Sequence, residues 1–331
     1  MTERYTQRSV RGESTKRERE RKDERFLIVI NPVSRGGNAL KEGMWLLKEL
    51  RKLNIDHEAF VTQNPGHATT IVERWVNSVD CVVAVGGDGT ANEVVNGIKS
   101  GGGDRKTFCV FPAGTADDYC HNVGIPRNRS GALDVMLNGR DRKIDLLKYN
   151  GRFAVVQLGV GVDAEIAYRT LSHKKIRIPA YFAVGLRIVF IERLQRSARR
   201  MRIEGENGVH EGRFLVAVFG NAPLYARYVY WMPEARMDDG IINMSAVGPM
   251  SPIPAWFLFL RCFNRDYRSD RIIYDSGRRF KVFLEEESFI QVDGEVYKYA
   301  SGETLDISIE PLALKVRVPS ETPIEAPFVN P

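Results

Sequence analysis

The N-terminal part of the chain alternates short apolar runs with segments of helical spacing, and this alternation limits the fold more than any other feature. Within residues 25–30, Arg25 is followed by an uninterrupted apolar run to Ile30, which suits a strand buried on both faces. Three further strand-like runs follow at residues 58–62, 80–85 and 107–111. Helical stretches separate or follow these runs, at residues 38–53, 66–75 and 90–98 and from Thr115 onward. Because parallel strands need crossover helices, this order predicts an open α/β sheet with parallel strands.

The sequence pattern changes after about residue 140, where strand-like runs dominate. Asn150-Gly151 separates the runs 143–149 and 152–158 and predicts a tight hairpin. One helical stretch, at about residues 178–200, interrupts this strand-rich half. The other strand-like runs are residues 214–219, 240–247, 271–274, 280–284, 288–292 and 304–309. This half of the chain therefore predicts an antiparallel β-sandwich with one inserted helix.

The chain of 331 residues is long enough for two domains, each with its own core. We expect an α/β domain over residues 25–142 and a β-rich domain over residues 143–318, whose last strands can return to the first domain. Residues 1–24 hold almost no apolar side chains and are expected to be a disordered tail, and the Pro-rich residues 319–331 are expected to be loose.

About half of the net charge of +6 lies at the N-terminus, where residues 1–25 carry nine Lys or Arg and six Asp or Glu. A solvated tail accounts for this charge, and weak attraction to anionic lipid or nucleic acid remains an alternative. No nucleic-acid reader motif accompanies the basic tail, so no nucleic-acid partner is expected. The sequence leaves a homodimer open.

The cysteines and the apolar runs bear on the compartment. Cys81, Cys109, Cys120 and Cys262 show neither CxxC spacing nor a histidine partner, which favours buried thiols in a reducing compartment. The N-terminus lacks an apolar signal region, and no run reaches the ~20 apolar residues of a spanning helix. We therefore expect a cytoplasmic protein, with peripheral contact at the inner face of the membrane left open.

Two segments have the mixture of basic and aromatic residues that is typical of membrane interfaces, residues 174–202 and residues 253–271. The second combines Trp256 and Phe257 with arginines such as Arg261 and Arg265. A core-facing apolar stripe with a solvated basic back is the alternative for each segment.

A glycine-rich turn, Gly86-Gly87-Asp88-Gly89-Thr90, follows the apolar run at 80–85 and opens a helix. Glycine lets the backbone turn sharply and approach a ligand closely. The N–H groups and the dipole at a helix start favour an anion such as phosphate. Asp88 is unfavourable beside phosphate unless a cation bridges the two, and Mg²⁺ shared with nucleotide phosphates is the natural candidate. A plain glycine turn is the alternative.

Two more polar, glycine-bearing turns follow strands of the same predicted sheet, at residues 31–37 and 111–118. Turns at the carboxyl ends of parallel strands converge on one crevice, where ligands bind in open α/β sheets. No turn matches GxxxxGK[ST] or GxGxxG, so a Walker-type site and a dinucleotide fingerprint are both excluded.

The order and spacing of the motifs resemble the diacylglycerol kinase catalytic-domain family, which includes bacterial diacylglycerol and lipid kinases and the sphingosine and ceramide kinases. The resemblance covers roughly residues 26–315. The Gly-Gly-Asp-Gly-Thr turn alone is not specific, because NAD kinases share it. The motifs are Asn31-Pro-x-Ser34, Gly86-Gly-Asp-Gly-Thr90, Pro112-x-Gly-Thr115-Ala-x-Asp118, Gln157-Leu-Gly-Val-Gly-Val-Asp163, Pro233-x-Ala235-x-x-Asp238-Asp239-Gly240 and Val292-Asp293-Gly294-Glu295.

The resemblance implies ATP and Mg²⁺ as cofactors, and a lipid hydroxyl at the membrane surface as acceptor. It implies that Glu295 is the general base, and that Asp239 with the backbone carbonyls of Arg236 and Ile241 holds a structural Mg²⁺. Asp88 would act with the catalytic Mg²⁺. The residues that would line the ATP site are Asn31, Pro32, Ser34, Thr62, Gly86, Gly87, Asp88, Gly89, Thr90, Asn92, Gly114 and Thr115.

The predicted activity is transfer of the γ-phosphate of ATP to diacylglycerol, which gives phosphatidic acid. A sphingoid-base or other lipid kinase, an NAD kinase-like enzyme and a non-catalytic nucleotide- or lipid-binding regulator are the alternatives.

Three positions depart from the family pattern. Asp117 replaces an asparagine and adds a carboxylate that Mg²⁺ or a nearby arginine must offset, Arg35 stands where the first loop often has glycine, and Arg227 interrupts a glycine run after Asn221-x-x-x-Tyr225.

Overall fold

A computed structural model describes residues 23–170, 197–226 and 228–320. The chain divides into two compact units. The first contains the residues up to Lys143 together with those from Leu314 onward, and the second contains Ile144–Ala313. Two strands, β5 (Arg140–Tyr149) and β18 (Thr304–Val318), each begin in one unit and end in the other.

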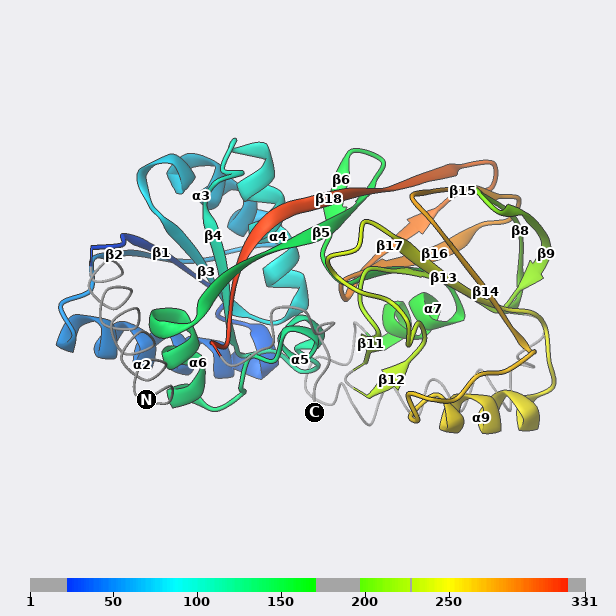
Figure 1. The fold of residues 1–331 in the computed structure, drawn as a ribbon, viewed down its shortest axis with the longest axis horizontal. Helices are drawn as coiled ribbons and strands as arrows, with labels where there is room; N and C mark the ends of the chain where they lie inside the picture. The colour runs from blue at the N-terminus through cyan, green and yellow to red at the C-terminus, as the bar shows by residue number, and fades with distance from the viewer. Residues whose placement is uncertain (1–22, 171–196, 227, 321–331) are drawn as a thin grey trace, which may run out of the picture. The chain divides into compact units, whose positions relative to one another are not determined.

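The first unit is built on a parallel sheet in the order β2-β1-β3-β4 (Figure 1). The last residues of β18 add to it, since Lys315 and Val316 pair in parallel with Thr107 and Phe108 of β4. Every residue of β1, β3 and β4 is buried, as expected for strands that helices cover on both faces. The strands are β1 (Phe26–Ile30), β2 (His57–Val61), β3 (Cys81–Gly86) and β4 (Thr107–Pro112).

Helices cover both faces of this sheet (Figure 1). On one face, α2 (Asn38–Lys52) and α6 (Arg129–Asn138) contribute Leu46 and Met136 to a core with Ile28 of β1. On the other face lie α3 (His67–Trp75) and α4 (Asp88–Ser100), which pack so closely that a Cβ on Gly97 would meet the backbone of α3. The remaining helical elements are η1 (Ser34–Gly37), η2 (Val76–Ser78) and α5 (Asp118–Val123).

The second unit is a sandwich of two mainly antiparallel sheets. One sheet has the order β14-β13-β10-β7-β16-β17, and the other contains the first part of β18, followed by β15, β8 and β9. Phe219 of the first sheet and Phe280 of the second meet in the core between them, with ring centroids 5.3 Å apart. The strands of the first sheet are β7 (Gln157–Gly161), β10 (Val216–Gly220), β13 (Ile242–Val247), β14 (Ile272–Gly277), β16 (Ser288–Val292) and β17 (Glu295–Tyr299).

A second core lies on the outer side of that sheet, where α9 (Pro252–Arg261) contributes Leu258 and α7 (Val162–Thr170) contributes Val162 and Ile166. Among the described helices, none is long and apolar enough to cross a membrane. The other strands of the unit are β6 (Arg152–Ala154), β8 (Arg199–Gly205), β9 (Gly208–Phe214), β11 (Leu224–Tyr225) and β12 (Val229–Tyr230).

The predicted fold class is confirmed, with a parallel α/β sheet in one unit and an antiparallel sandwich in the other. The hairpin at Asn150-Gly151 also forms, but the run 152–158 is not one strand. Residues 152–154 pair with β5, whereas β7 from Gln157 onward joins the opposite sheet. The strand predicted at 304–309 continues to Val318, because its second half pairs with β4.

The helix predicted at about residues 178–200 falls mostly outside the described residues. Its end is wrong, because Arg199 begins strand β8, in which buried Met201 and Ile203 alternate with exposed Arg200 and Arg202. Most of the basic segment 174–202, Arg227 and nearly all of both predicted tails likewise lie outside the described residues. Helices α7 and α9 and the hairpin of β8 and β9 were not predicted.

Candidate active site

The turn after β1 links the other two predicted turns of the first unit. The amide nitrogen of Asn31 donates to the carbonyl of Val85, 3.0 Å away, and its side-chain Nδ2 donates to the hydroxyl of Thr90 at 2.9 Å. Ser34 Oγ donates to the carbonyl of Ala113 at 3.3 Å. Two polar side chains of the first turn therefore hold one residue from each of the neighbouring turns.

The glycine turn after β3 leads directly into α4, which begins at Asp88. A Cβ on Gly87 would lie 2.9 Å from the Cα of Gly114, so the two turns can approach this closely only because both residues are glycine. Asp88 also joins the two turns, because its Oδ1 accepts from the amide of Tyr119 at 3.0 Å. The first turn of α4, whose N–H groups lie at the positive end of the helix dipole, begins at this junction.

The turn after β4 contains Asp117, which stands where the family pattern has asparagine and adds a negative charge to the predicted nucleotide site. Asp117 is buried, with φ of 56°. Its Oδ1 accepts from the amide of Gly114 at 2.7 Å, and its Oδ2 lies 2.9 Å from Nη2 of Arg127. Arg127 donates as well to the carbonyl of Gly114 at 3.1 Å. Arg127 therefore offsets the charge of Asp117, and the pair fixes the peptide of Gly114 against Gly87.

The structure thus brings together most of the residues predicted for the nucleotide, at one end of the parallel sheet. Thr62 follows β2, and its amide donates to the carbonyl of Ile30, the residue before Asn31. Asn92 lies one turn inside α4 and is buried. Arg35 belongs to η1 and adopts a positive φ of 47° with an exposed side chain.

Glu295 lies in the second unit, at the first residue of β17. Its Oε2 accepts from the hydroxyl of Tyr297 at 2.9 Å. Burial, followed by the charge of Glu295, raises the pKa of Tyr297 to about 12, so the phenol stays protonated and remains a donor. The guanidinium of Arg152 lies 5.3 Å from the centre of the Tyr297 ring. This arrangement orients the carboxylate of Glu295.

The turn before Glu295 is anchored by Asp293. Its carboxylate accepts from the amide of Val155 at 2.6 Å and from those of Val156 and Gln157 at 3.0 Å each. Asp293 has φ of 45°, and Gly294 after it has φ of 86°. Two successive left-handed residues make the tight turn that presents Glu295. Sequence reasoning identified the motif but missed this anchoring role, because the partners lie far away in the chain.

The predicted metal ligand Asp239 lies near two other carboxylates, those of Asp145 and Asp238. Burial raises the pKa of Asp145 and of Asp239, and the nearby charges of Asp238 and Asp145, respectively, add to this shift. Asp145 accepts from the amides of Gly240 and Leu312, each at 2.7 Å. Asp239 accepts from the amide of Ile241 at 3.0 Å. Such mutually repelling carboxylates are suited to a divalent cation, and the predicted ligands therefore fit Mg²⁺ chemically.

A strict cluster of metal ligands is not seen: in the described parts of the chain, no three His, Cys, Asp or Glu side chains are grouped closely enough to hold a metal ion. The predicted set at Arg236, Asp239 and Ile241 has one carboxylate and two backbone carbonyls, so it would depend mainly on main-chain oxygens. The residue that the sequence missed here is Asp145, which lies about ninety positions before the motif and closes the turn through Gly240.

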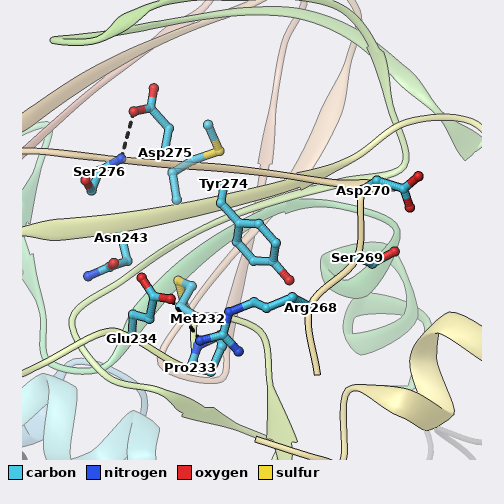
Figure 2. A pocket seen from close by; sticks show the side chains of 11 residues that line it. Met232, Pro233, Glu234, Asn243, Arg268, Ser269, Asp270, Tyr274, Asp275 and Ser276 are labelled. Atoms are coloured by element: carbon cyan, nitrogen blue, oxygen red, sulfur yellow. Dashed lines mark hydrogen bonds and ion pairs between the residues drawn. The ribbon is translucent and has the colours of Figure 1, made fainter. Parts of the chain in front are cut away.

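A pocket of about 520 Å³ opens elsewhere in the second unit (Figure 2). Arg268 and Glu234 line it and form an ion pair with a separation of 2.9 Å, and the ring of Tyr274 points toward them. Burial raises the pKa of Tyr274 to about 12. None of the predicted site residues lines this pocket; its lining residues are Met232, Pro233, Glu234, Asn243, Met244, Arg268, Ser269, Asp270, Tyr274, Asp275 and Ser276.

Comparison with known proteins agrees with this geometry. Residues 25–149 match the model of the diacylglycerol kinase catalytic domain. Proteins named diacylglycerol kinase from Staphylococcus aureus strains bovine RF122 / ET3-1 and MRSA252 are each 29% identical over 275 residues, which cover 82% of this chain and 86% of the relative.

The fold has solved counterparts. The crystal structure of a diacylglycerol kinase from Bacillus anthracis str. Sterne has a TM-score of 0.67 at 19% identity, covering 89% of this chain and 97% of the other. Another structure from the same strain reaches 0.72 at 20% identity, with coverages of 90% and 98%. At these identities the likeness establishes the fold alone.

The parallel sheet with three joined turns, followed by a β-sandwich, is the fold shared with these solved structures, and the sequence matches support a lipid kinase. The resemblance of this chain to the diacylglycerol kinase catalytic-domain family, expected from its motifs, is confirmed.

Proposed function

We propose that the protein is an ATP-dependent kinase that transfers the γ-phosphate to a lipid hydroxyl, with diacylglycerol as acceptor and phosphatidic acid as product. The observation that carries the proposal is the junction of three glycine turns at one end of the parallel sheet, in a region that matches the diacylglycerol kinase catalytic domain. Phosphoryl transfer needs placement and charge neutralisation more than covalent help, and such a junction can supply the placement.

In this proposal the first unit binds the nucleotide. The N–H groups at the start of α4 and around Gly87 donate hydrogen bonds to the phosphates of ATP. The side chains of Asn31, Ser34 and Thr115 surround the phosphates. Mg²⁺, when bound with the nucleotide, supplies the positive charge that lets Asp88 act beside the phosphates. Asp117 adds no net repulsion, because Arg127 neutralises it.

Glu295 is proposed as the general base. A carboxylate oxygen of Glu295 takes the proton from the lipid hydroxyl while the hydroxyl oxygen forms a bond to the γ-phosphorus of ATP. The bond between the γ-phosphorus and the bridging oxygen breaks, and ADP leaves with that oxygen. The hydroxyl of Tyr297 orients the carboxylate from the other side. Its pKa of about 12 prevents it from competing for the proton near neutral pH.

Turnover of radiolabelled ATP with a panel of acceptors tests the proposal. Diacylglycerol in mixed micelles is expected to be phosphorylated, and the panel includes a sphingoid base and NAD. Label transferred to NAD alone would replace the proposal with an NAD kinase-like activity. ATP binding without transfer to any acceptor would favour a non-catalytic regulator.

The base assignment has its own test. Glu295→Gln keeps the size of the side chain and removes the proton acceptor, so kcat is expected to fall by about 10²–10⁴-fold while the fold is retained. Glu287→Gln is the matched control, because Glu287 is an exposed acid of the same unit that pairs with Lys298 at 2.9 Å. Equal turnover by Glu295→Gln and the wild type would remove Glu295 from the role of base.

The structural metal is also proposed, at Asp239 and the carbonyls of Arg236 and Ile241. Bound there, the ion would relieve the repulsion among these carboxylates, which adds to burial in raising the pKa values of Asp145 and Asp239. Thermal unfolding gives a readout that does not depend on activity: Mg²⁺ is expected to raise the Tm of the wild type and not that of Asp239→Asn. An equal rise in Tm for both proteins would place the ion elsewhere.

We further propose a cytoplasmic location with peripheral contact at the membrane that holds the lipid acceptor.

A further inference from the structure

Helix α9 presents an apolar surface to solvent. Ile253, Phe257 and Leu260 are 65%, 58% and 45% exposed, and Phe263 just beyond the helix is 41% exposed. The first three are spaced by four and three residues, so they form one stripe along the helix. We call these four side chains the apolar face of α9.

The opposite side of the same helix packs into the protein. Leu258 is buried in the outer core of the sandwich, and Ala255 and Phe259 pack against that core. The helix is therefore anchored through one side and cannot rotate to bury the other. Single exposed apolar residues are ordinary, but a contiguous stripe of large ones marks an interaction surface.

The segment that ends and follows helix α9 carries more basic than acidic residues. Helix α9 contains no acidic residue. Four arginines end or follow it, and two aspartates lie among them, which leaves an excess of two positive charges between residues 261 and 271. The residues are Arg261, Arg265, Arg268, Arg271, Asp266 and Asp270.

The positions of two arginines are fixed. The guanidinium of Arg261 lies 5.7 Å from the centre of the Tyr267 ring, and Arg268 pairs with Glu234 at 2.9 Å. Trp256 lies beside the stripe and packs against Phe259, with ring centroids 6.1 Å apart. Aromatic and apolar side chains bordered by arginine form the composition that suits the boundary between lipid headgroups and acyl chains.

We propose that α9 docks the protein on an anionic bilayer, with its apolar face at the acyl boundary and the arginines among the headgroups. This inference rests on the proposed function only in that a kinase of membrane lipids must reach its acceptor at a bilayer. Ten residues of helix extend about 15 Å, which is half the thickness of the hydrocarbon core, so α9 lies in the interface and does not span.

A second copy of the chain is a less suitable occupant of this face. In a symmetric dimer each apolar face would meet the same face of the other copy, and both positively charged rims would come together. Like charges at such a rim oppose association, whereas anionic headgroups favour it.

Co-sedimentation of the full chain with vesicles tests the proposal. Vesicles of phosphatidylcholine with 30% phosphatidylglycerol are expected to bind the protein at low salt, and binding weakens as salt increases. Phe257→Ser combined with Leu260→Ser is expected to lower the vesicle affinity by at least about tenfold, because two large apolar side chains are lost from the interface. Val209→Ser is the matched control, since Val209 is 53% exposed on β9 of the same unit.

The charged rim is tested separately. Arg265→Gln and Arg271→Gln are each expected to lower the affinity for the same vesicles by about fivefold and to reduce its salt dependence. Arg278→Gln is the control, because Arg278 is an exposed arginine on the connection between β14 and β15. Equal losses for all three variants would show a general charge effect and overturn the role of the rim.

The depth to which α9 enters the bilayer is measured by the fluorescence of Trp256, one of four tryptophans in the chain. Lipids brominated near the headgroup end of the acyl chain are expected to quench wild-type fluorescence, and Trp256→Phe is expected to lose most of that quenching. Vesicle binding that is unchanged in the Phe257/Leu260 variant overturns the proposal. Light scattering that shows a dimer dissociated by this variant, without any vesicle binding, would assign the face to a second copy.

Turnover on diacylglycerol dispersed in detergent separates this proposal from the proposed function. A variant that keeps micellar turnover and loses vesicle binding supports docking through α9. Vesicle binding that depends on α9, in a protein without turnover on any lipid, would leave the docking surface intact and contradict only the kinase proposal.

Discussion

Two buried aspartates, Asp117 in the first unit and Asp293 in the second, share the same unusual backbone. Their φ angles are 56° and 45°, in the left-handed region that aspartate tolerates better than most residues. Each lies just before a functional element: Asp117 fixes Gly114 in the turn junction, and Asp293 stands two residues before Glu295. Each carboxylate is removed from water, so its charge must be offset within the protein.

The two charges are offset in different ways. Asp293 accepts three backbone N–H groups in succession, from Val155, Val156 and Gln157. Asp117 accepts one N–H and pairs with Arg127. The three backbone N–H groups are fixed by the fold and each needs an acceptor, whereas a guanidinium is a single mobile partner that a substitution can remove. The turn at Asp293 should therefore be the more sensitive of the two to loss of its carboxylate.

The largest effect is expected for Asp293→Ala. Three buried N–H groups lose their acceptor, and alanine does not favour the left-handed backbone, so the free energy of unfolding should fall by about 3–5 kcal/mol. Urea denaturation followed by circular dichroism measures this change. The exposed Asp266 of the same unit provides the control, and Asp266→Ala should stay within about 0.5 kcal/mol of the wild type. A loss below about 1 kcal/mol for Asp293→Ala would show that water replaces the carboxylate. The turn at Asp293 would then not be the more sensitive of the two.

The elements of the first unit could be predicted because their signals are local. The apolar runs that became β1, β3 and β4 end at the glycine-bearing turns, and parallel strands necessarily bring those turns to one edge of the sheet. The sequence therefore predicted which residues meet at the junction.

The remaining features depend on partners far away in the chain, which no local pattern encodes. Arg127 follows a proline in a connecting segment, and nothing in that segment indicates a bond to Asp117. The run 152–158 is continuous in hydrophobicity, although its two ends join different sheets. The same holds for the second half of β18, whose length is set by pairing with β4.

A third buried aspartate, Asp163, extends the comparison to a carboxylate with a weaker set of donors. Burial raises its pKa from the usual 3.8 to about 6, and the N–H groups at the start of α7 offset this only in part. The folded protein therefore favours the protonated form. Its contribution to stability is complete below pH 3.8 and is lost as the pH rises through 6.

The pKa difference at Asp163 corresponds to about 3 kcal/mol. Asp163→Asn should remove this dependence, so the variant gains stability over the wild type as the pH rises from about 4 to 7, by up to about 3 kcal/mol. Urea unfolding of both proteins at several pH values in this range measures the difference, in which the titration of other carboxylates cancels. A difference that is constant with pH would mean that Asp163 titrates normally in the folded protein.

The smallest effect is expected at the pair of Asp117 and Arg127. In Asp117→Asn one amide oxygen must serve two donors, and Arg127, whose side chain is 21% exposed, loses its counter-charge. The expected loss is about 1–2 kcal/mol, between the values of exposed and fully buried ion pairs. Arg127→Met should cost a similar amount, and the double variant should cost less than the sum, with a coupling energy of about 1–2 kcal/mol.

The exposed pair of Lys298 and Glu287, 2.9 Å apart, is the control for this cycle and should show coupling below about 1 kcal/mol. If the nucleotide binds at the turn junction, Asp117→Asn should also raise the KM for ATP several-fold with little change in kcat, because the pair positions Gly114 and takes no part in the transfer. Coupling as weak as that of the control would mean that Arg127 does not offset Asp117. Mg²⁺ would then be the remaining cation able to do so, and the effect of Asp117→Asn on the KM for ATP should depend on the Mg²⁺ concentration.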